Sequence, residues 1–170
     1  MSEESAETLV PPPFPRLPWG VAAAFVVFLA SLAMPAWEVG TFTAPPASAP
    51  SGAERFVGWE CGQWSATFFW WVLQGEGEDL LESSFTIPNA LMLCVPGLPL
   101  IRPSRRRLWP AIAATVASLH VLSWAIAKHG PSERILFGYW FWLASFVTLA
   151  SALWLWELRV RRAATLQAPA

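Results

Sequence analysis

Residues 135–162 read ILFGYWFWLASFVTLASALWLWELRVRR, an apolar run that ends in a group of arginines. No Asp, Glu, Lys or Arg lies between Ile135 and Trp156. At a rise of about 1.5 Å per residue, a helix of this length crosses the roughly 30 Å hydrocarbon core of a bilayer. Tryptophans stand near both ends of the run, where amphipathic rings favour the membrane interfaces. The stretch therefore predicts a transmembrane helix over 135–156, followed by a tail over 159–170.

Three further apolar runs precede it, at 17–37, 84–101 and 109–127. The first could instead be a cleaved signal peptide, although the long acidic segment before it is atypical of one. The second contains Pro96, which has no N–H to donate within a helix, so we expect a kink or break there. Four spans predict an all-α fold, namely a polytopic membrane protein with a four-transmembrane-helix bundle over residues 17–158.

The overall composition agrees with such a bundle. Of the 170 residues, 55% are hydrophobic and only 14% are charged, whereas a soluble domain carries roughly a quarter of charged residues. The net charge of −1 supplies no basic field that would attract nucleic acid. Cys61 and Cys94 form no CxxC pair, and we expect both to be free thiols because they would lie at different depths.

One long outer loop, residues 38–83, separates the first two spans. Within it, residues 56–75 read FVGWECGQWSATFFWWVLQG and are rich in tryptophan. The stretch contains Glu60 and few aliphatic residues, whereas a charge at mid-span costs on the order of 3 kcal/mol and each Leu or Phe returns only about 0.5 kcal/mol. We therefore expect a helix that lies in the outer membrane interface with its apolar face down. A membrane-spanning helix and a soluble cap on the bundle are the alternatives.

The distribution of Lys and Arg predicts the orientation, because these residues stay on the cytoplasmic side near span ends. Four spans with the N-terminus inside place eight basic residues inside (Arg16, Arg102, Arg105, Arg106, Arg107, Arg159, Arg161 and Arg162) and three outside (Arg55, Lys128 and Arg134). We expect a multi-pass protein of a bacterial inner membrane with a cytoplasmic C-terminus and a disordered cytoplasmic N-terminal tail over 1–16. A five-span arrangement gives the same count, because Arg16 and Arg55 exchange sides.

Polar residues inside the spans are candidates for function. His120 and Asn89 form the candidate intramembrane polar site. A predicted face of the third span places His120 among Ala113, Ala117, Trp124 and Ala127, so that it points into the bundle. There it either titrates near neutral pH as a relay or ligand residue, or bonds to a neighbouring helix.

Small residues in the fourth span recur on one face, and we expect them to serve helix packing: Gly138, Ser145, Thr148 and Ala152. Near the outer face, Glu38, Glu60 and His129 either converge into a polar site under the tryptophan-rich segment or stay as a solvated rim. The sequence contains no HExxH, GxSxG, P-loop or CxxC motif, so we expect no enzyme, no metal site and no cofactor.

Several short motifs resemble a widespread set of small bacterial membrane proteins with four predicted helices and no established activity. They are Met34-Pro-Ala-Trp37, Gly58-Trp-Glu60, Pro88-Asn89 before an arginine turn, and Gly138-Tyr-Trp-Phe-Trp-Leu-Ala-Ser-Phe146. The resemblance covers roughly residues 19–156 and implies the four-helix topology. Related sequences tend to place Asn before Pro, the reverse of Pro88-Asn89, which weakens any functional role for Asn89.

Two functions fit these features. The leading hypothesis is a structural or accessory protein that packs against membrane lipid, another membrane protein or a second copy of itself. The alternative is a transporter or channel for a small molecule or ion, with His120 and Asn89 beside the proline-broken second span.

Overall fold

The computed structural model of the chain describes residues 18–39, 54–75, 80–100, 108–127 and 133–166, and most of these are helical. In chain order the helices are α1 (Trp19–Leu32), α2 (Gly58–Gln74), α3 (Leu80–Ser83), α4 (Thr86–Cys94), the 3-10 helix η1 (Val95–Leu100), α5 (Leu108–Ala127) and α6 (Phe137–Leu166). Two segments are long and apolar enough to cross a membrane, Leu108–Ile126 in α5 and Phe137–Arg162 in α6. The apolar helices α1 and α4 are shorter.

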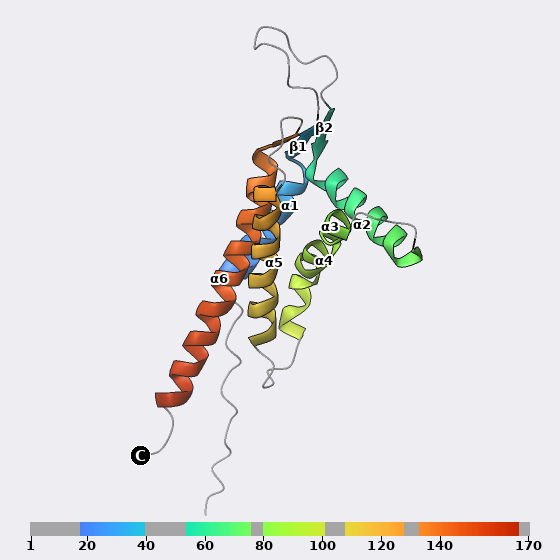
Figure 1. Cartoon of the computed structure of the whole chain (residues 1–170). Coiled ribbons are helices and arrows are strands. Elements are labelled where there is room, and N and C mark those ends of the chain that lie inside the picture. The colour runs from blue at the N-terminus through green and yellow to red at the C-terminus, as the bar shows by residue number, and fades with distance from the viewer. Residues whose placement is uncertain (1–17, 40–53, 76–79, 101–107, 128–132, 167–170) are drawn as a thin grey trace, which may run out of the picture.

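Helix α1 packs on α6, and α5 packs between α6 and α4 (Figure 1). Small residues make the α1–α6 contact close. A Cβ added at Gly20 would lie 2.9 Å from Cβ of Ala152, and one added at Gly138 would lie 2.7 Å from the Pro35 carbonyl oxygen. These two contacts, one near each end of α1, show that α1 and α6 run antiparallel. The predicted packing face of Gly138, Ser145 and Ala152 is indeed buried, with Thr148 half-buried beside it.

A small β-sheet corrects the all-α prediction. Strands β1 (Pro35–Val39), β2 (Glu54–Val57) and β3 (Glu133–Ile135) form an antiparallel sheet in the order β2-β1-β3. Pro35 favours extended backbone over helix, and β-branched or aromatic residues suited to strands follow on all three segments. The sheet brings the end of α1, the start of α2 and the start of α6 to the same end of the molecule.

The sheet also changes two predicted helix boundaries. The helix predicted over 17–37 ends at Leu32, and the one predicted from residue 135 begins at Phe137, because the flanking residues pair as strands. At its other end α6 continues to Leu166, well past the predicted end at residue 156. Arg159, Arg161 and Arg162 therefore lie on the last turns of a helix and not in an irregular tail.

The predicted break at Pro96 is confirmed, since the α-helical pattern of α4 ends at Cys94 and the tighter η1 begins at Val95. Pro96 cannot donate the N–H that would continue the α-helical ladder. Both cysteines are free, as expected. The α-helical part of this segment is thus only Thr86–Cys94, and its start lies at the sheet end of the bundle, beside the C-terminal part of α5.

Helix α2 leaves the bundle sideways from the sheet (Figure 1). Its first residue, Gly58, lies so close to the end of α1 that an added Cβ would be 2.9 Å from Cα of Leu32. Glu60 Oε2 accepts a hydrogen bond from the Val57 backbone N–H at 2.9 Å, which satisfies a donor at the helix N-terminus. At the other end Gly75 has φ 78°, the left-handed conformation that commonly terminates helices at glycine.

Candidate functional site

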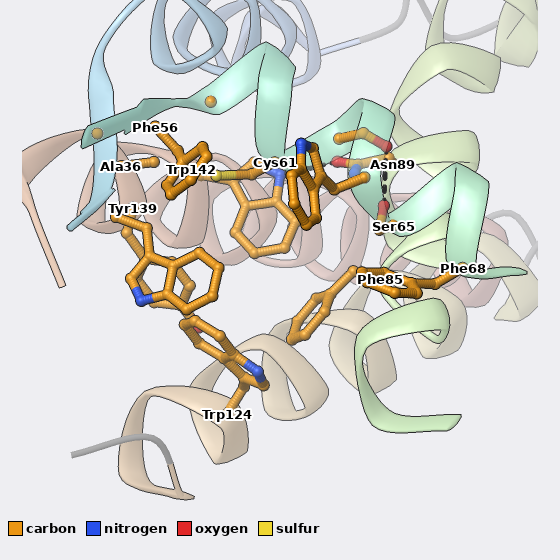
Figure 2. Close-up of a pocket in the computed structure, with 15 residues that line it drawn as sticks. Ala36, Phe56, Cys61, Ser65, Phe68, Phe85, Asn89, Trp124, Tyr139 and Trp142 are labelled. Carbon is orange, nitrogen blue, oxygen red and sulfur yellow. Dashed lines mark hydrogen bonds between the residues drawn. The ribbon is translucent and has the colours of Figure 1, made fainter. Parts of the chain in front are cut away.

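A cavity of about 120 Å³ lies where α2 meets the bundle. Its wall is built from β1, β2, α2, α5, α6 and the start of α4, so five separate stretches of chain contribute (Figure 2). Ser65 in the middle of α2 accepts a hydrogen bond from Thr86 Oγ1 at 3.5 Å, which ties α2 to the start of α4. Gly62, one turn earlier, faces Asn89: its added Cβ would lie 3.6 Å from Nδ2.

Aromatic rings form most of the cavity wall. Phe85 contacts the rings of Trp124 and Trp142 at centroid separations of 5.3 and 5.6 Å. Tyr139 stacks against Trp124 at 5.4 Å, and Trp37 meets the same indole edge-on at 5.9 Å. Such offset and edge-to-face pairs are the favoured geometries of aromatic side chains. The wall is therefore a continuous ring network, and no charged side chain belongs to it among the described residues.

The polar atoms of the cavity fall into two groups. Some are paired: Trp142 Nε1 donates to Asn89 Oδ1 at 3.0 Å, the Ser65 hydroxyl donates to the Gly62 carbonyl at 2.9 Å, and the Tyr139 hydroxyl donates to the Val121 carbonyl. Two are not paired: the buried indole nitrogens of Trp37 and Trp124 have no acceptor. An indole nitrogen can only donate, and these two nitrogens are enclosed by neighbouring atoms, so they do not open into the cavity.

Cys61 also lines the cavity, half-buried between α2 and the bundle. Burial raises the pKa of its thiol to about 11, and the negative charge of the neighbouring Glu60 adds to the rise. The thiol is therefore neutral at physiological pH and a poor nucleophile.

Glu38 and Glu60 were predicted either to converge into one polar site or to stay as solvated rim residues. The structure does not fully match either expectation. Glu38 is buried in the middle strand, where it accepts a hydrogen bond from Arg55 Nε at 3.0 Å across the sheet. Its register partners are Arg55 on one side and Arg134 on the other. Glu60 caps α2 and lines a shallow polar groove with Arg55 and Gln63. Phe56 and Trp64 border both this groove and the aromatic cavity.

The two candidate residues inside the bundle lie in separate contacts. Asn89 lines the cavity and holds Trp142. His120 is half-buried, and its Nε2 lies 2.8 Å from the Ser84 hydroxyl oxygen, with the Phe85 ring 5.1 Å away. Of the face predicted around His120, Ala117 and Trp124 are buried, but Ala113 is exposed. The buried residues of α5 instead include Ala111, Ala114, Ala117, Val121 and Trp124. This face agrees with the predicted one from Ala117 onward, but before it the buried residue is Ala114 and not Ala113.

The remaining predicted residues divide between described and undescribed parts of the chain. His129, Arg102, Arg105, Arg106 and Arg107 lie outside the described residues. Arg159, Arg161 and Arg162 are exposed near the end of α6. Arg161 Nε donates to Glu157 Oε1 at 2.8 Å, the i,i+4 pairing expected of an exposed helix surface.

Most residues of the cavity were not predicted as site residues. Phe56, Cys61, Ser65, Phe85 and Tyr139 come from three elements and the turn before α4, and no local spacing connects them. The one signal was the density of tryptophan in residues 56–75, which indicated a surface and not a cavity. Comparison with known proteins adds nothing to this geometry: no protein-family model, curated protein or solved structure matches the chain.

Proposed function

We propose that this chain is a four-span membrane protein whose helix α2 lies in the outer interface, and that it acts without catalysis as a lipid-binding accessory protein. The observation that carries the proposal is the outward-facing surface of the bundle. Within the candidate spans only 33% of the residues of α5 and 44% of those of α6 are buried. The core helix of a soluble protein would be mostly buried, so these apolar surfaces need another apolar environment.

Tryptophans at both ends of the bundle support the same placement. Trp19 is 91% exposed at the start of α1, and Trp109 is exposed at the start of α5. Trp154 lies at this end too, donating to Thr115 Oγ1 at 3.0 Å. Trp140 is exposed near the opposite end of α6, about 21 Å from Trp154 along the helix axis. Two levels of exposed indoles on an apolar bundle are typical of the two membrane interfaces.

The sheet supports four spans over five. If residues 56–75 spanned the membrane, α4 would start at the end of the bundle opposite the sheet. Instead Ser84 at the α4 start contacts His120, and Phe85 contacts Trp124, both in the part of α5 nearest the sheet. Since α2 also begins at the sheet, the stretch from Gly58 to Phe85 starts and finishes near the same end of the bundle, which supports four spans. The proposal accordingly places α2 in the outer interface, with the exposed side chains Trp70, Trp71 and Leu73 against lipid.

Depth-dependent fluorescence quenching tests this placement. A cysteine-free chain carrying Leu73→Cys or, as the matched control in mid-α5, Leu119→Cys is labelled with a fluorophore and reconstituted in phosphatidylcholine vesicles. Both residues are exposed on helices. We expect the label at 73 to be quenched best by a nitroxide high on the acyl chain and the label at 119 by one near the chain end. Equal deep quenching at both positions would mean that α2 spans, and no quenching at 73 would mean that α2 is a soluble cap; either result rejects the proposal.

A further inference from the structure

We infer that the polar groove at the start of α2 binds the headgroup of a zwitterionic phospholipid, of the phosphocholine or phosphoethanolamine type. The groove is lined by strand β2 and the first turns of α2, and it is distinct from the aromatic cavity. The inference rests on the proposed placement of α2 in the outer interface, where such headgroups lie. It names the class of lipid that the proposed function leaves open.

Side chains of three chemical kinds line the groove. Glu54 and Glu60 supply carboxylates, Arg55 supplies a guanidinium, and the indoles come from Trp59 and Trp64. The groove holds about 400 Å³, within the range of about 300–1,000 Å³ that is typical of pockets for small ligands. A headgroup with one ammonium and one phosphate needs partners of these same kinds.

The carboxylates and indoles match the ammonium end of the headgroup. Glu60 accepts from the Val57 N–H through Oε2, and that bond leaves Oε1 for a further donor. Trp59 and Trp64 are 54% and 53% exposed, so much of each indole is open to a ligand. An organic cation is attracted to the face of an indole ring, and quaternary ammonium groups are recognised in this way.

Arg55 matches the phosphate end. Its Nε donates to Glu38 Oε1 at 3.0 Å, which uses one of the five N–H donors of a guanidinium. The side chain is 71% exposed, and guanidinium groups commonly bind phosphate through two parallel N–H groups. Because Glu38 already balances the charge of Arg55, a purely anionic headgroup would face the two groove carboxylates without compensation. The phosphate therefore needs an ammonium attached to it.

The acyl chains have a continuous apolar path away from the groove. Trp64 lines the groove and contacts the Phe68 ring at 5.9 Å, and Phe68 contacts the Trp71 ring at 5.5 Å. Their spacing of four and three residues places the three rings on one flank of α2, which leads away from the sheet (Figure 1). A soluble ammonium compound would leave this flank unused, so the row of rings favours a lipid.

Native mass spectrometry of the full chain in a maltoside detergent tests the inference. The probes are dimyristoyl phosphatidylcholine, phosphatidylethanolamine and phosphatidylglycerol, which share their chains and differ in the headgroup. We expect the first two to bind at least about threefold more tightly than phosphatidylglycerol, which lacks the ammonium. Glycerophosphocholine, a headgroup without chains, should bind at least about tenfold more weakly than phosphatidylcholine, because it buries no chain surface.

Variants show whether the groove sets this preference. Glu54→Gln combined with Glu60→Gln removes both negative charges, while the amide oxygen at position 60 can still accept from the Val57 N–H. The preference for phosphatidylcholine over phosphatidylglycerol should then disappear. Trp59→Leu should lower it about twofold. The matched control is Trp70→Leu, which replaces a tryptophan 59% exposed on the same helix but outside the groove, and it should keep the preference. Since the preference is a ratio within one sample, a misfolded fraction does not change it.

Equal binding of the three lipids, or a preference that survives the loss of both carboxylates, would overturn the inference. Binding of glycerophosphocholine as tight as that of phosphatidylcholine would do so too, because the ligand would then be a soluble ammonium compound. These results leave the membrane placement untouched, since the quenching experiment on α2 reads depth and not headgroup. Absence of binding by every lipid would reject both this inference and the lipid-binding function.

Discussion

At the scale of single residues, the two polar side chains predicted inside the bundle, Asn89 and His120, have partners far away in the sequence. Trp142 and Asn89 are 53 residues apart, and Ser84 and His120 are 36 apart. Sequence analysis identified His120 and Asn89 because polar side chains are rare in apolar spans. It could not supply their partners, since no periodicity within a helix encodes a contact between helices. The sequence did not predict the cavity for the same reason. Its aromatic residues form no recognisable pattern within their own helices and strands.

The pKa of Cys61 gives a residue-scale prediction. Its thiol pKa is raised from 9.0 to about 11, first by burial and then by the charge of Glu60. The thiolate is the reactive form, so at pH 8 the alkylation rate should be about a hundredfold below that of an unperturbed thiol. Measured on the Cys94→Ala chain, the rate should rise about tenfold per pH unit through pH 10.

Glu60→Gln provides the control for this titration. The substitution removes the negative charge, while its amide oxygen can still accept from the Val57 N–H. Alkylation of Cys61 at pH 9 should then be faster than in the unchanged chain. A rate that levels off near pH 9 in the Glu60-containing chain would contradict the buried position of the thiol.

At the scale of elements, apolar runs identified the helices, but outside α5 they did not give the helix ends. Hydropathy marks where an apolar run ends, which need not be where the helix ends. Helix α6 continues past Trp156 because Glu157 and Arg161 are compatible with helix. Strands β1 and β3 are five and three residues long, too short for an alternating pattern to be recognised. Pro35 follows the end of the first helix, and the extended backbone that begins there forms β1 of the sheet. Pro96, whose effect is local, was predicted at its correct place, and so was the third span, predicted over 109–127 and observed as Leu108–Ala127.

The contact between α1 and α2 gives an element-scale prediction. Gly58→Ala places a Cβ 2.9 Å from Cα of Leu32 and against the Ser31 carbonyl oxygen. Both are backbone atoms, so the start of α2 or the end of α1 must move, at a cost of about 1–3 kcal/mol. The thermal unfolding midpoint in detergent should fall by several degrees.

Gly97→Ala is the matched control for that substitution, because nothing lies within 4 Å of its added Cβ. Surface substitutions of this kind change stability by about 0.5 kcal/mol or less, and the midpoint should stay within about two degrees. An equal fall in both variants, or none in Gly58→Ala, would show that α2 does not begin against α1.

At the scale of the whole molecule, the sheet is what organises the chain. It gathers the end of α1, the start of α2 and the start of α6 at one end of the bundle (Figure 1). The C-terminal part of α6, with Arg159, Arg161 and Arg162, lies at the other end. Counting basic residues could not decide between four and five spans, since Arg16 and Arg55 exchange sides between them. The contacts that favour the four-span proposal are tertiary ones, between the start of α4 and the last turns of α5.

Labelling of single cysteines in intact cells tests the four-span placement most directly. A cysteine-free chain carries one of Thr8→Cys, Ser48→Cys, Leu80→Cys, Ser104→Cys or Thr165→Cys and is treated with a membrane-impermeant maleimide. The positions at 48 and 80 should be labelled at once, and those at 8, 104 and 165 only after the membrane is permeabilised. Labelling at 8 with protection at 48 would mean five spans, and labelling at 165 in intact cells would contradict the orientation altogether.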